Sequence, residues 1–521
     1  MDTNAGRERS GSATAAASTF YSKLVSMRGN IGLDVKRNHY RRLSESGIDA
    51  SPLANSEDSD DAEKANVCQT YFTFFKSFIG IGILALPHGF KTAGSVFGIF
   101  MILMASTASW YCIELLMETA DIVEQQIKEG TVNPNLLPDG ANQASATSTP
   151  DEENSDTLET ITISDLNVGD ITYSDIGRAA YGSIGAKIVD FSIVFAQMGF
   201  STAYLIFIGS NVEAALNTCI GPSSWAAIVT VLVCPLVWLK SLKSLSFGAI
   251  IADCAIVFGL VTILTYAAVN SGDVTRPPQD PAQAVGSSPM IFFGTAVFAF
   301  EGAGIVLPMK QSMQEPQEFS KVLKNGLICV TTLYVFFPLC VYLSYGSVTK
   351  DMITENLPSG KMIVIFVELS YSLGLFFTYP IMMFPAVQIL ESSRMYASFK
   401  NFMSGKTYDD EKVPSILFRS WLVVLTLIAA TTIPKFGTFV AIVGSVACSL
   451  IAFIMPALFS IKLKGPTSDT KLKWGMVALG IIGGSISLVI EIADLFASDG
   501  ESNQTANQLR CYGNLTGNST Q

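Results

Sequence analysis

The sequence predicts an all-α integral membrane protein with eleven transmembrane helices, of which the first and the sixth are discontinuous. Of its 521 residues, 49% are hydrophobic and only 15% are charged, whereas average soluble domains carry about 25% charged residues. The apolar residues gather in runs of about 20, the length that crosses a bilayer. Two of these runs contain a G-x-G motif followed by aliphatic residues and a proline.

Eleven apolar runs set the expected order of the elements. They lie at 69–89, 95–118, 188–210, 224–239, 247–269, 290–308, 326–345, 362–390, 416–433, 436–461 and 474–496. The fourth run is the weakest candidate, because it is short and contains Pro235, which interrupts helical hydrogen bonding. We therefore expect one transmembrane domain over residues 67–498.

Three polar segments lie outside the runs. Residues 1–66 are expected to form a disordered cytosolic tail, residues 120–170 a disordered acidic insert in the cytosol, and residues 499–521 a C-terminal tail. Polar, highly charged chain of this kind cannot bury enough apolar surface to fold. The net charge of −11 is therefore expected to reflect solvated segments rather than a basic partner.

Basic residues are distributed unevenly and predict the orientation in the membrane. The first run is preceded by Lys23, Arg28, Lys36, Arg37, Arg41 and Arg42, and alternate loops from there carry most of the remaining basic residues. Because positively charged loops face the cytosol, we expect a cytosolic N-terminus and, with an odd number of spans, a non-cytosolic C-terminus. Three N-glycosylation sequons in that tail, at Asn503, Asn514 and Asn518, support the same orientation.

The two G-x-G motifs read almost alike, as GIGILALP at residues 80–87 and GAGIVLP at residues 302–308. Glycines and a nearby proline weaken a helix, and a broken helix is tolerated in lipid only where it lines a protected cavity. Carriers built from two inverted halves hold their substrate at matching broken helices. The first motif therefore predicts a binding site at Gly80, Ile81, Gly82 and Ile83.

Two readings of the first motif are open. Its free N–H groups and the start of the following half-helix suit an anion such as a carboxylate. Glycines at this spacing also allow two helices to pack closely. The repetition of the motif at a corresponding position favours the binding site.

The second motif follows an ionisable residue in the middle of a span, and it predicts substrate contacts at Phe298, Phe300, Glu301, Gly302 and Gly304. A carboxylate within the membrane is costly unless it is paired, protonated or faces a polar cavity. Glu301 is therefore the candidate carrier of a coupled proton, although it could equally accept a substrate's ammonium group or cap the broken backbone. Phe298 and Phe300 could enclose an apolar side chain, or pack in the core or against lipid.

The motifs of enzymes and metal sites are missing from the sequence. It contains neither a Walker A sequence nor an HExxH or G-x-S-x-G motif, and its nine cysteines show no CxxC spacing. We therefore expect no enzymatic activity, no cofactor and no metal, and expect an ion gradient or the substrate's own gradient to supply the energy.

The chain resembles the amino acid/auxin permease family in four stretches: KSFIGIGILALP at 76–87, QMGF at 197–200, FFGTAVFAFEG at 292–302 and VLPMK at 306–310. Among its members, the chain is most similar to the proton-assisted amino-acid transporters and the vacuolar neutral amino-acid transporters. The resemblance implies a LeuT/APC-like 5+5 inverted repeat plus one helix, in which spans one and six are the broken members of the two halves. It also implies transport of small neutral amino acids, usually with protons.

Two departures qualify what the resemblance implies. Animal members carry a proton-sensing histidine three residues before the lysine that corresponds to Lys76, where this chain has Thr73. Animal members also share a disulfide between non-cytosolic loops. Cys219 lies in one such loop, the loop after the fifth span has no cysteine, and Cys511 in the tail could pair with Cys219 instead. The first departure favours the vacuolar branch.

Together these observations predict a secondary active transporter of small neutral amino acids, coupled to H⁺ and working by alternating access. A membrane amino-acid sensor that signals through its cytosolic segments, and a carrier of auxin-like substrates, are the alternatives. The expected partners are amino acids, H⁺ and membrane lipid, and not nucleic acid. A vacuolar or lysosomal membrane is favoured, with the plasma membrane second.

Overall fold

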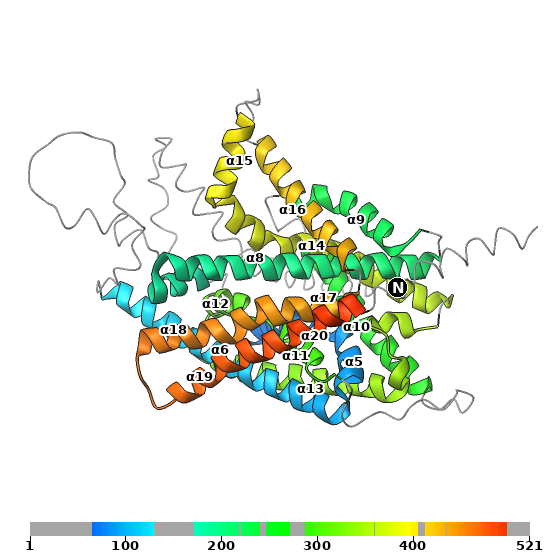
Figure 1. Ribbon diagram of the computed structural model, residues 1–521, viewed down its shortest axis with the longest axis horizontal. Helices are drawn as coiled ribbons and strands as arrows, with labels where there is room; N and C mark the ends of the chain where they lie inside the picture. The colour runs from blue at the N-terminus through cyan, green and yellow to red at the C-terminus, as the bar shows by residue number, and fades with distance from the viewer. Residues whose placement is uncertain are drawn as a thin grey trace, which may run out of the picture.

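The computed structural model describes residues 65–129, 171–217, 220–239, 246–270, 286, 288–358, 360–404, 412–433 and 435–497 (Figure 1). Within these ranges every regular element is a helix, and the single β-type bridge joins Ala65 to Met313. The all-helical class predicted from the sequence is therefore confirmed.

The elements follow one another as helices of very different length. They are α4 (Val67–Phe78), α5 (Gly82–Ala93), α6 (Ser95–Lys128), α8 (Tyr173–Leu216), α9 (Pro222–Val237), α10 (Ser246–Asn270), α11 (Ile291–Ala299), α12 (Ala303–Gln311), α13 (Phe319–Tyr345), α14 (Met362–Glu391), α15 (Arg394–Ser404), α16 (Lys412–Thr432), α17 (Phe436–Val443), α18 (Met455–Lys464), α19 (Thr470–Ala478) and α20 (Gly484–Ala497). Short π-helical segments, Gly444–Cys448, Leu450–Ile454 and Leu479–Gly483, join α17 to α18 and α19 to α20.

Eight helices of the described chain are long and apolar enough to cross a membrane, and a ninth span results if the bent pair α4 and α5 is counted as one. Two shorter apolar helices, Pro222–Val237 and Cys254–Val269, fall below that length. Each of these segments overlaps an apolar run predicted from the sequence. The chain is therefore a multi-pass membrane protein.

Two helices extend furthest beyond the predicted runs. α6 continues to Lys128, past residue 120, where we expected the disordered insert to begin. α8 starts at Tyr173 with a capping box in which Thr172 and Asp175 each accept the other's backbone N–H, and it kinks at Gly182, where φ is 65°. The prediction used hydropathy, which does not register the polar ends of helices that leave the bilayer.

The helices form two sets. α8, α9, α14 and α16 contact one another, whereas α4, α5, α6, α11 and α13 form a second set of mutual contacts. Figure 1 shows α9, α15 and α16 on one side of the long α8, and α6, α11, α13 and α18 on the other. Both glycine motifs belong to the second set.

Hydrogen bonds tie the helix ends together at two faces of the molecule. At one face, the Lys91 ammonium donates to the carbonyl of Thr349 over 2.9 Å, and the Gly286 N–H donates to the carbonyl of Ala93 over 2.8 Å. At the other, the Ala65 N–H donates to Ser312 over 2.8 Å, and the Gln314 N–H donates to Ala65 over 2.9 Å. The second pair of bonds joins the start of α4 to the end of α12.

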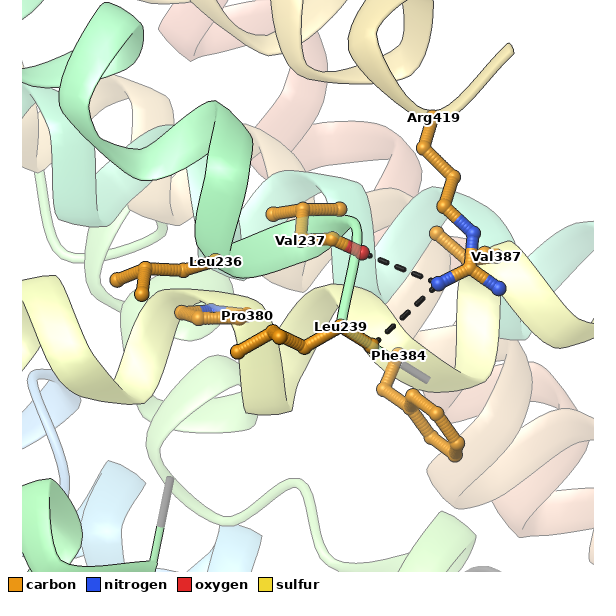
Figure 2. Close-up of a pocket in the computed structure, with 7 residues that line it drawn as sticks. All are labelled: Leu236, Val237, Leu239, Pro380, Phe384, Val387 and Arg419. Carbon is orange, nitrogen blue, oxygen red and sulfur yellow. Dashed lines mark hydrogen bonds between the residues drawn. The ribbon is translucent and has the colours of Figure 1, made fainter. Parts of the chain in front are cut away.

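A buried arginine fastens α9, α14 and α16 (Figure 2). Arg419 is only 5% exposed, and its Nε and Nη2 groups each donate to the Glu391 carboxylate over 2.8 Å. Its Nη1 donates to the carbonyls of Val237 and Leu239, over 3.1 and 3.5 Å. Arg419 therefore satisfies carbonyls that the end of α9 leaves without helical partners.

We expect Glu391→Ala to lower the thermal unfolding midpoint of the detergent-purified protein. Removing one partner of a buried ion pair leaves an uncompensated charge, which costs about 3–5 kcal/mol. Lys321→Ala is the control, because the Lys321–Glu318 pair lies on the surface and should contribute little. A Glu391→Ala midpoint equal to that of the control would contradict the fastening role of Arg419.

Candidate functional site

At the first glycine motif the chain forms two helices that meet at a bend. α4 ends at Phe78 and α5 begins at Gly82, and the two helices are bent by 53°. Pro87 lies inside α5 and has no N–H, so the carbonyl of Ile83 has no intrahelical donor. The break thus exposes both N–H and C=O groups along a few residues.

The second motif interrupts its span with less bending. α11 ends at Ala299 and α12 begins at Ala303, and Phe300 and Gly302 between them have non-helical dihedrals. Pro308 lies inside α12 and deprives the carbonyl of Gly304 of its intrahelical donor. The two motifs therefore release the same kinds of backbone group.

The two breaks lie against each other through one glycine from each motif. A Cβ on Gly82 would lie 3.1 Å from the Cα of Ala299, and a Cβ on Gly302 would lie 2.3 Å from a ring carbon of Phe78. Each half-helix therefore ends against the glycine of the opposite motif. Close packing, the alternative reading of the motif, accounts for these two glycines.

The other two glycines border open space. A Cβ on Gly80 would have no neighbour within 4 Å, and a Cβ on Gly304 would meet only the Glu301 carboxylate at 3.9 Å. These positions need no glycine for packing. They are the places in the paired breaks where the backbone is accessible to another molecule.

A tyrosine that the sequence analysis did not single out joins both breaks. The hydroxyl of Tyr334 on α13 lies 2.5 Å from the carbonyl of Phe78 and 3.3 Å from the carbonyl of Ala299. Its side chain is fully buried, and its ring packs edge-to-face on Phe300 with centroids 5.1 Å apart. One tyrosine in an apolar helix carries no sequence signal for such a role, because only the fold brings it to the breaks.

The Glu301 carboxylate lies at the start of α12 and accepts a hydrogen bond from the backbone N–H of Gly304. This bond caps the broken backbone, one of the three roles considered from the sequence. A role for Glu301 in proton or substrate binding stays a prediction.

The two phenylalanines of the second motif face the protein interior. Phe298 is 4% exposed and Phe300 is 1% exposed, so neither faces lipid. Phe298 packs edge-to-face on Phe200 with ring centroids 4.6 Å apart. Phe200 belongs to the QMGF stretch of α8, whose Gly199 lies against Val443 of α17.

The irregular helix after α17 packs tightly on α11. A Cβ on Gly444 would lie 1.9 Å from the carbonyl oxygen of Gly294, so the two backbones are in direct contact. Gly444 opens a π-helical segment, and such segments occur frequently at functional sites. The buried hydroxyl of Ser445 in that segment has no hydrogen-bond partner among the described residues.

Several predicted residues lie outside the described residues: Asn503, Asn514 and Asn518 of the sequons, and Cys219 and Cys511 of the suggested disulfide. Thr73, which occupies the position of the histidine in animal relatives, lies inside α4. Its hydroxyl donates to the carbonyl of Gln69 over 3.0 Å.

A multi-pass helical protein with two facing helix breaks belongs to the class of membrane transport proteins. Residues 63–132 and 158–493 match the family described as "Transmembrane amino acid transporter protein". The match covers well over half of the chain, which therefore belongs to this family. The family assignment from the sequence is confirmed.

Two relatives found by sequence similarity are named as amino acid transporters. The chain is 31% identical to "Amino acid transporter ANT1" of Arabidopsis thaliana, over 81% of this chain and 90% of that protein. It is 26% identical to "Vacuolar amino acid transporter 4" of Saccharomyces cerevisiae, over 76% of this chain and 52% of that longer protein. A manganese transporter from Eremococcus coleocola has a TM-score of 0.42 at 12% identity, covering 85% of this chain and 91% of that one.

We expect Gly302→Ala to lower both the amount of folded protein and its thermal unfolding midpoint. The added methyl group would overlap the ring of Phe78, which is itself stacked on Phe74 with centroids 4.5 Å apart. Gly80→Ala is the matched control, since its methyl group enters open space. Equal midpoints for the two variants would show that Gly302 is not a packing position.

Proposed function

We propose that this protein is a secondary active transporter of small neutral amino acids, coupled to H⁺ and working by alternating access. The observation that carries the proposal is the contact between the two broken helices in one helical set. Broken helices of this kind form the substrate sites of inverted-repeat carriers. The relatives are named as amino acid transporters, and their names do not favour the alternative of an amino-acid sensor.

The polarity of the half-helices suits a zwitterion. α5 and α12 begin at the breaks, and the N-terminus of a helix carries partial positive charge. α4 and α11 end there, and the C-terminus of a helix carries partial negative charge. An amino acid offers one carboxylate and one ammonium group, so it matches both kinds of end.

The proposed site combines these ends with the predicted side chains. Gly80, Ile81, Gly82 and Ile83 would present backbone to the carboxylate, and Gly302 and Gly304 would shape the opposite wall. The buried rings of Phe298 and Phe300 would limit the site to small, uncharged side chains.

Alternating access would come from relative motion of the two helical sets. In the proposed architecture, α9 and α10 also cross the membrane, which gives eleven spans arranged as two inverted halves of five and one added helix. The broken spans are then the first member of each half. They cross in opposite directions, because each half contains an odd number of spans.

Saturable uptake of labelled alanine, glycine or proline into vesicles containing the protein is the direct test. We expect uptake to rise with an imposed pH gradient, and vesicles without protein to show only the linear leak. No saturable flux of any amino acid, in either direction, would overturn the proposed function. Competition by unlabelled amino acids and by auxin-like acids would define the substrate class.

We expect Glu301→Gln to abolish the stimulation by a pH gradient while amino-acid exchange across the membrane continues. An amide resembles a permanently protonated carboxyl, so net transport can no longer carry a proton. Glu491→Gln is the matched control, because Glu491 is a buried carboxyl on α20 outside both breaks. Loss of the pH effect in Glu491→Gln alone would place the coupled proton there instead.

The proposed orientation places the N-terminus in the cytosol and the C-terminal tail in the lumen of a vacuole or lysosome, with the plasma membrane as the second location. We expect enzymatic deglycosylation to increase the electrophoretic mobility of the protein, because the tail would carry N-glycans. The triple variant with glutamine at Asn503, Asn514 and Asn518 should show no such shift. An unglycosylated wild type expressed in a eukaryotic cell would argue against this orientation.

A further inference from the structure

Tyr334 contacts both broken helices at equivalent points. Its hydroxyl lies within hydrogen-bond distance of Phe78 and Ala299, the last residues of α4 and α11. Each of these residues ends the half-helix that precedes its break. One side chain on a third helix, α13, therefore meets the C-terminal ends of both half-helices.

Two such ends repel each other unless a donor lies between them. The C-terminal end of each half-helix carries partial negative charge. The Phe78 carbonyl also accepts the backbone N–H of Gly80 over 3.0 Å, and the Phe78 and Ala299 carbonyls are close enough to share the Tyr334 hydroxyl. A buried carbonyl that loses a hydrogen-bond donor is destabilised. The Tyr334 hydroxyl therefore offsets a repulsion that would otherwise separate the ends.

The contribution of the Tyr334 hydroxyl can be tested separately from the packing of α13. The ring of Tyr334 contacts Phe300, and a Cβ on Gly326, two turns earlier on α13, would lie 2.6 Å from the ring of Phe74 on α4. Replacing the tyrosine with phenylalanine would keep these apolar contacts. It would remove only the donor between the two carbonyls.

We propose that Tyr334 is a positioning residue that sets substrate affinity by holding the two helix ends in register before substrate arrives. This inference rests on the proposed function, in which the substrate's ammonium group lies at these ends. With the ends held, binding does not have to order them, and preorganisation of this kind increases affinity. Without the hydroxyl, substrate binding must also bring the two helix ends together, so the net binding free energy is smaller.

The test compares Tyr334→Phe with Tyr379→Phe. Tyr379 is also fully buried, but its hydroxyl lies 2.6 Å from that of Thr426, on α16 rather than at the breaks. We expect Tyr334→Phe to raise KM for labelled alanine about tenfold, which corresponds to about 1.4 kcal/mol, with Vmax per transporter within about twofold of wild type. Tyr379→Phe should leave KM unchanged.

A purely structural role would give a different pattern. Tyr334→Phe would then lower the amount of protein and Vmax while KM stayed at the wild-type value, and this result would overturn the inference. If Tyr334→Phe does not accumulate in the membrane, p-aminophenylalanine incorporated at position 334 supplies an N–H donor at the same place on the ring. It should restore accumulation with a KM nearer to wild type, and failure to do so would count against the inference.

Alanine binding to purified protein, followed by its thermal stabilisation, separates failure of this inference from failure of the proposed function. Wild-type protein that binds alanine without transporting it would overturn the proposed function, and the ratio of Kd between Tyr334→Phe and wild type would still decide the inference. A ratio near one overturns it. Wild-type protein that neither binds nor transports any of the three amino acids overturns both.

Discussion

Backbone groups that leave a helix inside a membrane must find partners within the protein, because the hydrocarbon offers none. The two breaks in this chain release such groups at Phe78 and Ala299, and Tyr334 supplies a donor to both carbonyls. The arrangement requires the breaks to lie close together, which in turn requires glycine at positions 82 and 302. The packing of α4, α5, α11 and α13 against one another follows from the need to give these backbone groups partners within the protein.

The two breaks differ in how their backbone groups find hydrogen-bond partners. The first bends its span by 53° and contains only glycine and isoleucine between the half-helices. The second contains Glu301, whose carboxylate accepts the Gly304 N–H. The second break thus carries its own carboxylate acceptor. The first has no acidic side chain, and its Gly80 N–H donates to the backbone carbonyl of Phe78 over 3.0 Å. In the proposed site, this difference would place an anionic group at the first break and a cation at the second.

Sequence patterns predicted the apolar helical segments and the positions of the glycine motifs between half-helices, because both follow from local chemistry. Runs of apolar residues, and glycines near a proline, can be recognised from positions that are neighbours in the sequence. Tyr334 could not be found this way, since its partners lie 256 and 35 residues away and are carbonyl groups, which carry no residue identity. The contact between Gly294 and Gly444 was hidden for the same reason. The Gly444–Cys448 π-helical segment was hidden too, because its composition resembles that of any apolar helix.

The ends of α4, α5 and α12 show which contacts the proposed alternating-access cycle would have to disrupt. At one face, two backbone hydrogen bonds link Ala65, before α4, to the Ser312–Gln314 segment after α12, and each contributes about 0.5–1.5 kcal/mol net. Differential binding of a ligand to two states can supply free energy of this size. Because the break uncouples α4 from α5, α4 can tilt at this face while α5 keeps its bond from Lys91 to Thr349 at the other. The same breaks that form the proposed site would then also serve as its hinges.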